Sequence, residues 1–142
     1  MDLYQLTMAQ AYFDLDMHAP AVFELFVRKL PKTRQFLVAA GLEQIADFIE
    51  SMRFISEDIE FLSRLDLFRT PFLRYLESVR FTGSVHAMAE GTPFFADEPI
   101  LRVTGPILEA QLLESRVLNI GHFQSLIASK AARCRWPQTA VN

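Results

Sequence analysis

Residues 2–8 read Asp2-Leu3-Tyr4-Gln5-Leu6-Thr7-Met8 and carry the signals of a helix N-terminus. Asp2 can act as the N-cap, and Gln5 stands three residues later, where it completes a capping-box-like pattern. The first turn also contains an aromatic ring, Tyr4, near backbone N–H groups that lack intrahelical partners. A helix N-terminus with an acid and a ring is a place where an anion or an aromatic ligand can bind.

The residues that follow predict a helix over positions 2–18 that is apolar on two sides. One stripe consists of Leu6, Ala9, Phe13 and Met17, and the other of Tyr4, Met8, Tyr12 and Leu15. Such a helix is either a central core helix or one that packs on its own domain with one side and on a second subunit with the other. The spacing leaves both interpretations open.

The composition indicates a single globular domain. Of the 142 residues 51% are hydrophobic and 22% charged, which is the balance of a folded chain with its own core. The net charge of −3 and the lack of a dense basic run disfavour nucleic-acid binding. The single cysteine, Cys134, excludes an internal disulfide and suits a reducing compartment. Without a membrane-length apolar run or a signal core, we expect a cytoplasmic protein with no membrane partner.

The periodicity predicts an α+β fold in which mixed or antiparallel strands pack against helices. Strands are expected over 21–29, 36–40, 81–90, 94–96 and 100–104, and helices over 42–52, from Ser56 and from Thr70-Pro71. The short strands after Phe81 favour a small antiparallel meander or half-barrel. The last expected elements are a helix over 107–119, a kink or break at Gly121 and a second helical segment over 122–135.

Local chemistry alone assigns no reaction. The three histidines, His18, His86 and His122, are scattered, no metal-ligand spacing appears, and the glycines form no phosphate-binding loop. Arg28, at the end of the first strand, is either an exposed edge residue or a guanidinium for a phosphate. Lys130, Arg133 and Arg135 near the end of the last helix complement its dipole, which we favour, or bind phosphate.

Five stretches, taken in order, nevertheless resemble the N-terminal domain of the nicotinate phosphoribosyltransferase family. They are Asp2–Met8, Phe23-Glu24-Leu25-Phe26-Val27-Arg28-Lys29, Phe36-Leu37-Val38-Ala39-Ala40-Gly41-Leu42, Gly91-Thr92-Pro93 and Ala128-Ser129-Lys130-Ala131-Ala132-Arg133. Each stretch alone is weakly specific, and their order and spacing over residues 2–135 make the resemblance specific. It implies the N-terminal domain of a type II phosphoribosyltransferase over 1–135, followed by an atypical tail over 136–142.

The resemblance implies an ATP- and Mg²⁺-assisted transfer of ribosyl 5-phosphate from phosphoribosyl pyrophosphate onto nicotinate, a glycosyltransferase and ligase reaction of NAD biosynthesis. It also implies a cytoplasmic homodimer in which each active site combines one subunit's barrel with its neighbour's N-terminal domain. By the same resemblance Tyr4 stacks on the pyridine ring, Asp2 lies beside it, and Arg28 reaches the phosphates of the donor.

The family's catalytic histidine and its irregular α/β barrel have no counterpart in this sequence, so no residue here is assigned a catalytic role. We therefore expect a fragment or frameshifted product that is inactive alone. Two alternatives stay open: a non-catalytic module that dimerises through the first helix, and a fragment of a nicotinamide-using relative.

Overall fold

The computed structural model describes residues 2–30, 32 and 34–135, and the expected tail over 136–142 lies outside these residues. In chain order the elements are α1 (Leu3–Asp14), β1 (Pro20–Leu25), β2 (Leu37–Val38), α2 (Leu42–Ser51), α3 (Ser56–Arg64), α4 (Thr70–Ser78), β3 (Ser84–Ala87), β4 (Pro93–Phe94), β5 (Leu101–Pro106) and α5 (Ile107–Arg135). The helices expected from Leu42, Ser56 and Thr70 are confirmed. The predicted α+β class, with antiparallel strands and packed helices, is also confirmed.

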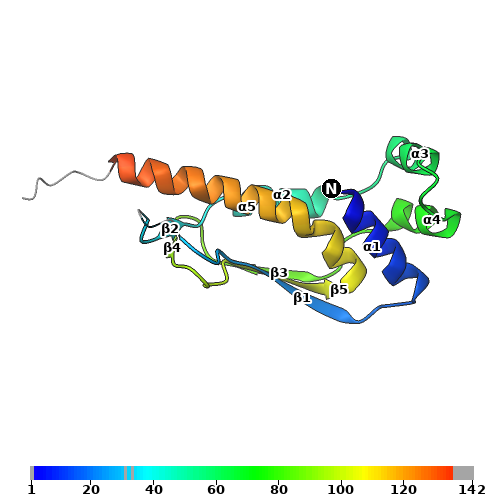
Figure 1. Cartoon of the computed structure of the whole chain (residues 1–142), viewed down its shortest axis with the longest axis horizontal. Helices are drawn as coiled ribbons and strands as arrows, with labels where there is room; N and C mark the ends of the chain where they lie inside the picture. Colours follow the sequence, from blue (N-terminus) through cyan, green and yellow to red (C-terminus); the bar gives the residue numbers. More distant parts are fainter. Residues whose placement is uncertain (1, 31, 33, 136–142) are drawn as a thin grey trace, which may run out of the picture.

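The longest element, α5, runs along most of the molecule, and the strands lie on one side of it (Figure 1). Of the two predictions for Gly121, a kink or a break, the break is wrong, because the helix continues through this residue. A Cβ atom added at Gly121 would lie 2.6 Å from Leu25 Cδ2, so the glycine lets β1 approach the helix closely. Its role is close packing within a continuous helix.

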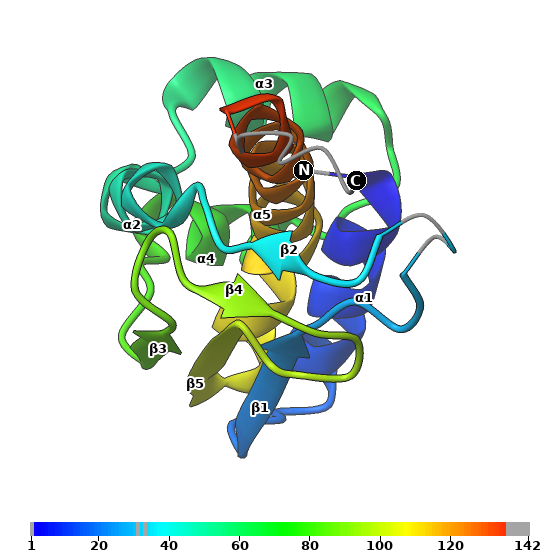
Figure 2. The same cartoon turned by 90° about the vertical axis from the view of Figure 1, so that its left-hand side faces the viewer.

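The strands form two antiparallel sheets, one with the order β1-β5-β3 and one in which β2 pairs with β4. Figure 2 shows the short β2–β4 pair beside the larger sheet. The predicted meander is wrong in its connectivity, because β4 leaves its sequence neighbours and pairs with β2. A tight turn makes this possible: Gly91 has φ +82° and donates its N–H to Ala39 O at 2.8 Å, while Ala39 N donates to Thr92 O at 2.9 Å.

The core consists of two clusters of buried side chains. The larger one joins α1, α2, α3, α4, α5 and β5, and its aromatic part brings Phe13 within 5.8 Å of Phe72 and within 5.2 Å of Tyr75, between ring centroids. The smaller one contains four buried residues, Leu37, Ala39, Phe94 and Ile100, beneath the β2–β4 sheet. The two clusters thus support opposite ends of α5.

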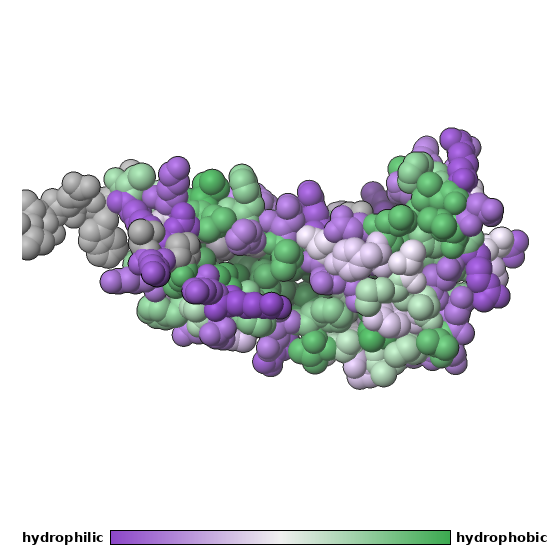
Figure 3. Space-filling model, in the orientation of Figure 1, coloured by the Kyte–Doolittle hydropathy of each residue, from purple (hydrophilic) through white to green (hydrophobic). Residues whose placement is uncertain are grey.

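The first helix is apolar on two sides, as predicted, but it is shorter than predicted. It ends at Asp14, and Asp16 with φ +54° turns the chain, so Met17 lies outside the helix. Leu6 and Ala9 are buried, whereas Tyr4, Met8 and Leu15 are 47%, 39% and 71% exposed. Figure 3 shows hydrophobic side chains on the surface at the end of the molecule that α1 and α3 form. One side of α1 therefore packs in the core, and the other is exposed except at Tyr12, which packs against the larger cluster.

Candidate functional site

The first turn of α1 places Tyr4 on the surface while its backbone is held. Asp2 N donates to Gln5 Oε1 at 3.0 Å, and Gln5 N donates to Asp2 O at 3.1 Å, which closes the helix start. Thr7 Oγ1 donates to Tyr4 O at 2.9 Å within the same helix. Tyr4 is 47% exposed, so part of this residue is accessible from solvent.

The residue that anchors this turn is Gln5, whose side chain is fully buried at 0% exposure. Its Nε2 donates to Gln111 O at 2.8 Å, and its Oε1 accepts a hydrogen bond from Ser115 Oγ at 2.7 Å. Both partners belong to α5, so a single amide joins the start of α1 to the long helix. Buried amides are stable only when hydrogen-bonded, and this one bonds through both its oxygen and its nitrogen.

A carboxylate lies at the outer side of this network. Gln111 Nε2 donates to Glu114 Oε2 at 2.6 Å, which holds the half-buried Glu114 beside the start of α1. Partial burial, the Glu114 carboxylate and the Asp2 carboxylate, in that order, raise the pKa of the Tyr4 phenol above 10.0. The phenol therefore stays protonated and uncharged at neutral pH.

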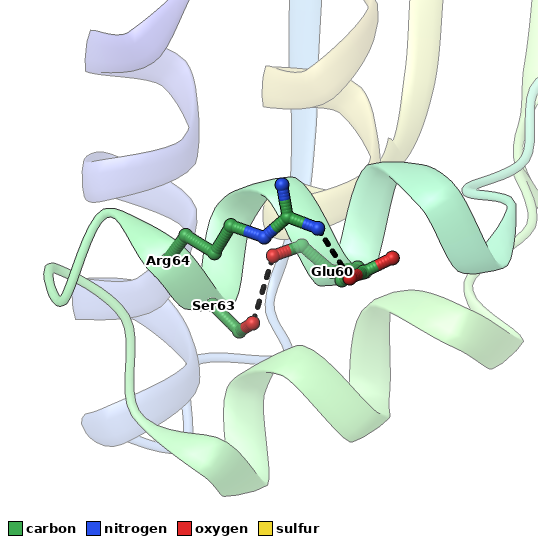
Figure 4. Close-up of polar contacts among 3 residues, drawn as sticks. All are labelled: Glu60, Ser63 and Arg64. Atoms are coloured by element: carbon green, nitrogen blue, oxygen red, sulfur yellow. Dashed lines mark hydrogen bonds and ion pairs between the residues drawn. The ribbon is translucent and has the colours of Figure 1, made fainter.

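The network differs from the ion pairs on the surface nearby. In α3, Arg64 contacts Glu60 one helical turn earlier, and Ser63 Oγ donates to Glu60 O at 2.8 Å (Figure 4). Both charged side chains are more than 60% exposed, so solvent screens their attraction. The hydrogen bonds of Gln5 are shielded from water and keep their directional preference.

The second predicted site residue, Arg28, lies beyond the end of its strand. The expected strand over 21–29 is too long, because β1 pairs with β5 only as far as Leu25 opposite Leu101. The chain then follows the loop before β5, where Asp97 N donates to Val27 O at 2.9 Å. The predicted alternation is confirmed, since Val27 points inward and Arg28 is exposed. Among the described residues, no hydrogen bond or ion pair involves the guanidinium.

The structure does not bring Tyr4 and Arg28 together within this chain. Tyr4 lies where α1 contacts residues 111–115 of α5, whereas Val27, next to Arg28, packs on the cluster beneath β2 and β4. That cluster adjoins the part of α5 where Ser125 and Ser129 bind the β2 segment. Ten residues from Ser115 to Ser125 correspond to about 15 Å of helix. Tyr4 and Asp2 therefore lie at one end of α5 and Arg28 at the other.

Four other side chains that can carry charge or react, those of His18, Lys130, Arg133 and Cys134, are exposed on the surface. Lys130 and Arg133 are exposed in the last turns of α5, where cations complement the helix dipole. His18 Nε2 lies 2.7 Å from Asp16 Oδ1 on the surface, and Cys134 is an exposed free thiol. Within residues 2–30, 32 and 34–135, no three His, Cys, Asp or Glu side chains converge as metal ligands, and no helix is long and apolar enough to cross a membrane.

Sequence reasoning identified Gln5 only as a helix-start residue and missed its contact with α5. The available signal was the pair Gln111 and Ser115, two polar residues four positions apart on a helix face with buried Leu108 and Leu112. Polar side chains on a buried face need partners, and a buried polar residue elsewhere can supply them.

Comparison with known proteins gives consistent matches. Residues 1–121 match the model of the nicotinate phosphoribosyltransferase N-terminal domain. The chain is 52% identical over 132 residues to a nicotinate phosphoribosyltransferase of Mycobacterium tuberculosis, covering 93% of this chain and 28% of that protein. It is 43% identical over 135 residues to the Bacillus subtilis nicotinate phosphoribosyltransferase, covering 94% of this chain and 28% of that protein. The chain thus spans less than a third of the length of these relatives.

Solved structures agree with the sequence matches. A crystal structure of human nicotinic acid phosphoribosyltransferase superposes with a TM-score of 0.87 at 36% identity, covering 95% of this chain and 28% of that one. A nicotinate-nucleotide pyrophosphorylase from Pyrococcus furiosus superposes with a TM-score of 0.60 at 19% identity over 84% of this chain and 23% of that one, a likeness of fold alone.

Proposed function

Because the chain belongs to the nicotinate phosphoribosyltransferase family, whose N-terminal domain it matches, we propose that it supplies the nicotinate-binding part of such an enzyme. The family is one of enzymes, and the reaction joins nicotinate to ribosyl 5-phosphate from phosphoribosyl pyrophosphate. The observation that carries the proposal is an exposed ring, Tyr4, on a helix start that a buried glutamine fixes to α5.

Tyr4 is the residue proposed to stack on the pyridine ring of nicotinate. A flat heteroaromatic acid binds well to the face of an aromatic side chain, and an uncharged phenol adds no repulsion toward its carboxylate. Asp2 lies directly before this turn and is proposed to border the same site. Neither residue exchanges a proton in the reaction, and both orient the base.

Arg28 is proposed to bind the phosphates of the donor. Its guanidinium is exposed and has no partner among the described residues, so it is available for an anion. In the reaction the pyridine nitrogen forms a bond to C1′ of the ribose as the bond from C1′ to the pyrophosphate oxygen breaks. Pyrophosphate leaves with its bonding electron pair, so a nearby cation stabilises the transition state.

A homodimer with shared sites is proposed for the complete enzyme. Tyr4 and Arg28 lie at different ends of α5, so one domain does not place them around the same ligand. The exposed apolar residues of α1, Leu3, Tyr4 and Met8, together with Leu15 just after the helix, fit a contact with a neighbouring subunit. The isolated chain is therefore proposed to be inactive, because it supplies only part of each site.

ATP, Mg²⁺ and a cytoplasmic location belong to the proposal through the family resemblance. Phosphoribosyl pyrophosphate carries charges that Mg²⁺ neutralises when it is bound. Among the described residues, no three His, Cys, Asp or Glu side chains lie together as metal ligands. The exposed free thiol of Cys134 suits a reducing compartment.

The proposal is tested with a hybrid enzyme in which residues 1–135 replace the matching segment of the M. tuberculosis relative. We expect the hybrid to form nicotinate mononucleotide and the 142-residue chain alone to form none. Tyr4→Ala in the hybrid should weaken nicotinate binding by about 1–3 kcal/mol, since a stacked, buried ring contact is lost.

Three results would contradict the proposal. They are a folded but inactive hybrid, a preference of the hybrid for nicotinamide, and robust turnover by the isolated chain. Self-association of the 142-residue chain in sedimentation, together with a hybrid that binds neither nicotinate nor phosphoribosyl pyrophosphate, would instead support a non-catalytic dimerising module.

A further inference from the structure

We propose that Gln5 is the positioning residue for the nicotinate-stacking ring: its buried amide fixes the first turn of α1 on α5 and thereby sets the place of Tyr4. The inference rests on the proposed role of Tyr4 and adds a residue that contacts no ligand. It predicts that substitution of the fully buried Gln5 changes how tightly the hybrid enzyme binds nicotinate and leaves the binding of phosphoribosyl pyrophosphate unchanged.

The first reason is that the Tyr4 ring is not fixed by its own packing. Tyr4 is 47% exposed, and the Glu114 carboxylate of α5 lies close enough to raise the pKa of its phenol, so the position of the ring depends on how the first helical turn sits on α5. Terminal turns fray readily because their N–H groups lack intrahelical partners. Something outside the turn must hold it if the ring is to meet a ligand in one orientation.

The second reason is the set of bonds that Gln5 makes. Its Oε1 accepts from Asp2 N within the turn and from Ser115 Oγ on α5, and its Nε2 donates to Gln111 O on α5. The same amide therefore closes the helix start and attaches it to the long helix. The Gln5 side chain is fully buried, and its hydrogen bond to Gln111 O is buried as well, so an amide that loses this partner is costly. Loss of the side chain releases the turn and its attachment together.

The chain offers a matched control in Gln10, on the same helix. Gln10 also links α1 to another element through both ends of its amide: Nε2 donates to Leu67 O at 3.3 Å, and Oε1 accepts from Arg69 N at 2.7 Å. These bonds join α1 to the segment before α4, more than one helical turn beyond Tyr4. If the glutamines only attach α1 to the rest of the domain, substitution of either one should have the same effect. If Gln5 positions Tyr4, only the substitution of Gln5 should affect nicotinate binding.

The test compares Gln5→Met with Gln10→Met in the hybrid enzyme, because methionine keeps the length of the side chain without its hydrogen bonds. We expect Gln5→Met to raise KM for nicotinate about tenfold, while kcat and KM for phosphoribosyl pyrophosphate change by less than about twofold. Gln10→Met should leave all three within about twofold.

Ser115 provides a milder variant in case Gln5→Met fails to fold. Ser115→Ala removes one donor to Gln5 and should raise KM for nicotinate about threefold, and Ser115→Thr, which keeps the hydroxyl, should restore it. In the 142-residue chain itself, amide hydrogen exchange should become faster in the first turn of α1 for Gln5→Met and stay unchanged there for Gln10→Met.

The outcomes separate this inference from the proposed function. Equal effects of Gln5→Met and Gln10→Met, or an equal rise in KM for both substrates, would overturn the positioning role and leave a purely structural one. If Tyr4→Ala raises KM for nicotinate but neither Gln5→Met nor Ser115→Ala does, the inference fails and the role of Tyr4 stands. If Tyr4→Ala has no effect, the proposed role of Tyr4 fails and the inference with it.

Discussion

The two ends of α5 are attached to the rest of the domain in different ways. At the α1 end, the long side chain of Gln5 in α1 forms hydrogen bonds with Gln111 O and Ser115 Oγ of α5. At the other end, short hydroxyls on α5 bind strand backbone: Ser129 Oγ accepts from Val38 N at 2.8 Å, and Ser125 Oγ accepts from Ala40 N at 3.2 Å.

The difference follows from which backbone groups are free. Inside a helix the N–H groups are already paired, and a C=O group can accept a second hydrogen bond only from a donor that reaches it, so joining two helices by hydrogen bonds requires a long side chain from at least one of them. A short strand such as β2 has an unpaired edge, which a serine can reach directly. The position of Tyr4 thus depends on the identity of one side chain, whereas that of Arg28 depends on the path of the backbone.

The largest effects should come from removing the buried ring that supports each end. Phe72 and Phe94 are both 0% exposed, in the larger and the smaller cluster respectively. Phe72→Ala and Phe94→Ala should each lower the free energy of unfolding by about 3–5 kcal/mol, through lost burial and a cavity.

Urea unfolding of the 142-residue chain measures both changes, and amide hydrogen exchange locates them. Phe72→Ala should speed exchange in α1 and α4, and Phe94→Ala should speed it mainly in β2 and β4. Identical exchange patterns would show that the two ends do not behave as separate regions.

A smaller effect is expected where the loop before α2 approaches α5. Gly41 has φ +94°, and a Cβ atom there would lie 2.9 Å from Gln124 Cβ. Gly91 has a similar φ of +82° but open space around it, which makes Gly91→Ala the matched control. Gly91→Ala should lower the free energy of unfolding by about 1–2 kcal/mol through backbone strain alone. Gly41→Ala should lower it by about 1–3 kcal/mol more, because the new methyl group is crowded.

The measurement is again urea unfolding, with both variants compared to the parent chain. Equal losses would mean that the contact between the Gly41 loop and α5 yields without strain. In that case the β2–β4 end would depend on its serine hydrogen bonds rather than on close packing.

Sequence patterns predicted the elements well and their contacts poorly. The two-sided first helix, the helix start at Thr70-Pro71 and the alternation through Arg28 follow from periodicity and local backbone preferences, which act within a few residues. The continuity of α5 through Gly121 did not follow, because the reason for a glycine at this position is the close approach of Leu25, which is distant in sequence. The pairing of β2 with β4 likewise depends on a long-range contact.

The same limit applied to the candidate site. Tyr4 and Arg28 were identified by resemblance, and their exposure agrees with a role in binding. The contacts of Gln5 span more than 100 residues of sequence, so no local pattern around Gln5 reveals them.

The smallest effect concerns the charge near Tyr4. Since burial and the Glu114 carboxylate raise the pKa of Tyr4 above 10.0, the unfolded chain releases this phenolic proton at a lower pH than the folded chain. The stability from the neutral phenol is therefore fully present below pH 10.0 and is lost as the pH rises through the folded-state pKa. Glu114→Gln keeps an acceptor for Gln111 and removes the charge, so the pKa of Tyr4 should fall toward its ordinary value. Ring NMR resonances followed against pH measure this change.

Tyr75 is the internal control, because burial and then Glu109 raise its pKa and Glu114 is not among the causes. If Glu114→Gln leaves the pKa of Tyr4 unchanged, Glu114 is not held beside the ring. The hydrogen-bond network at the α1 end would then stop at Gln111.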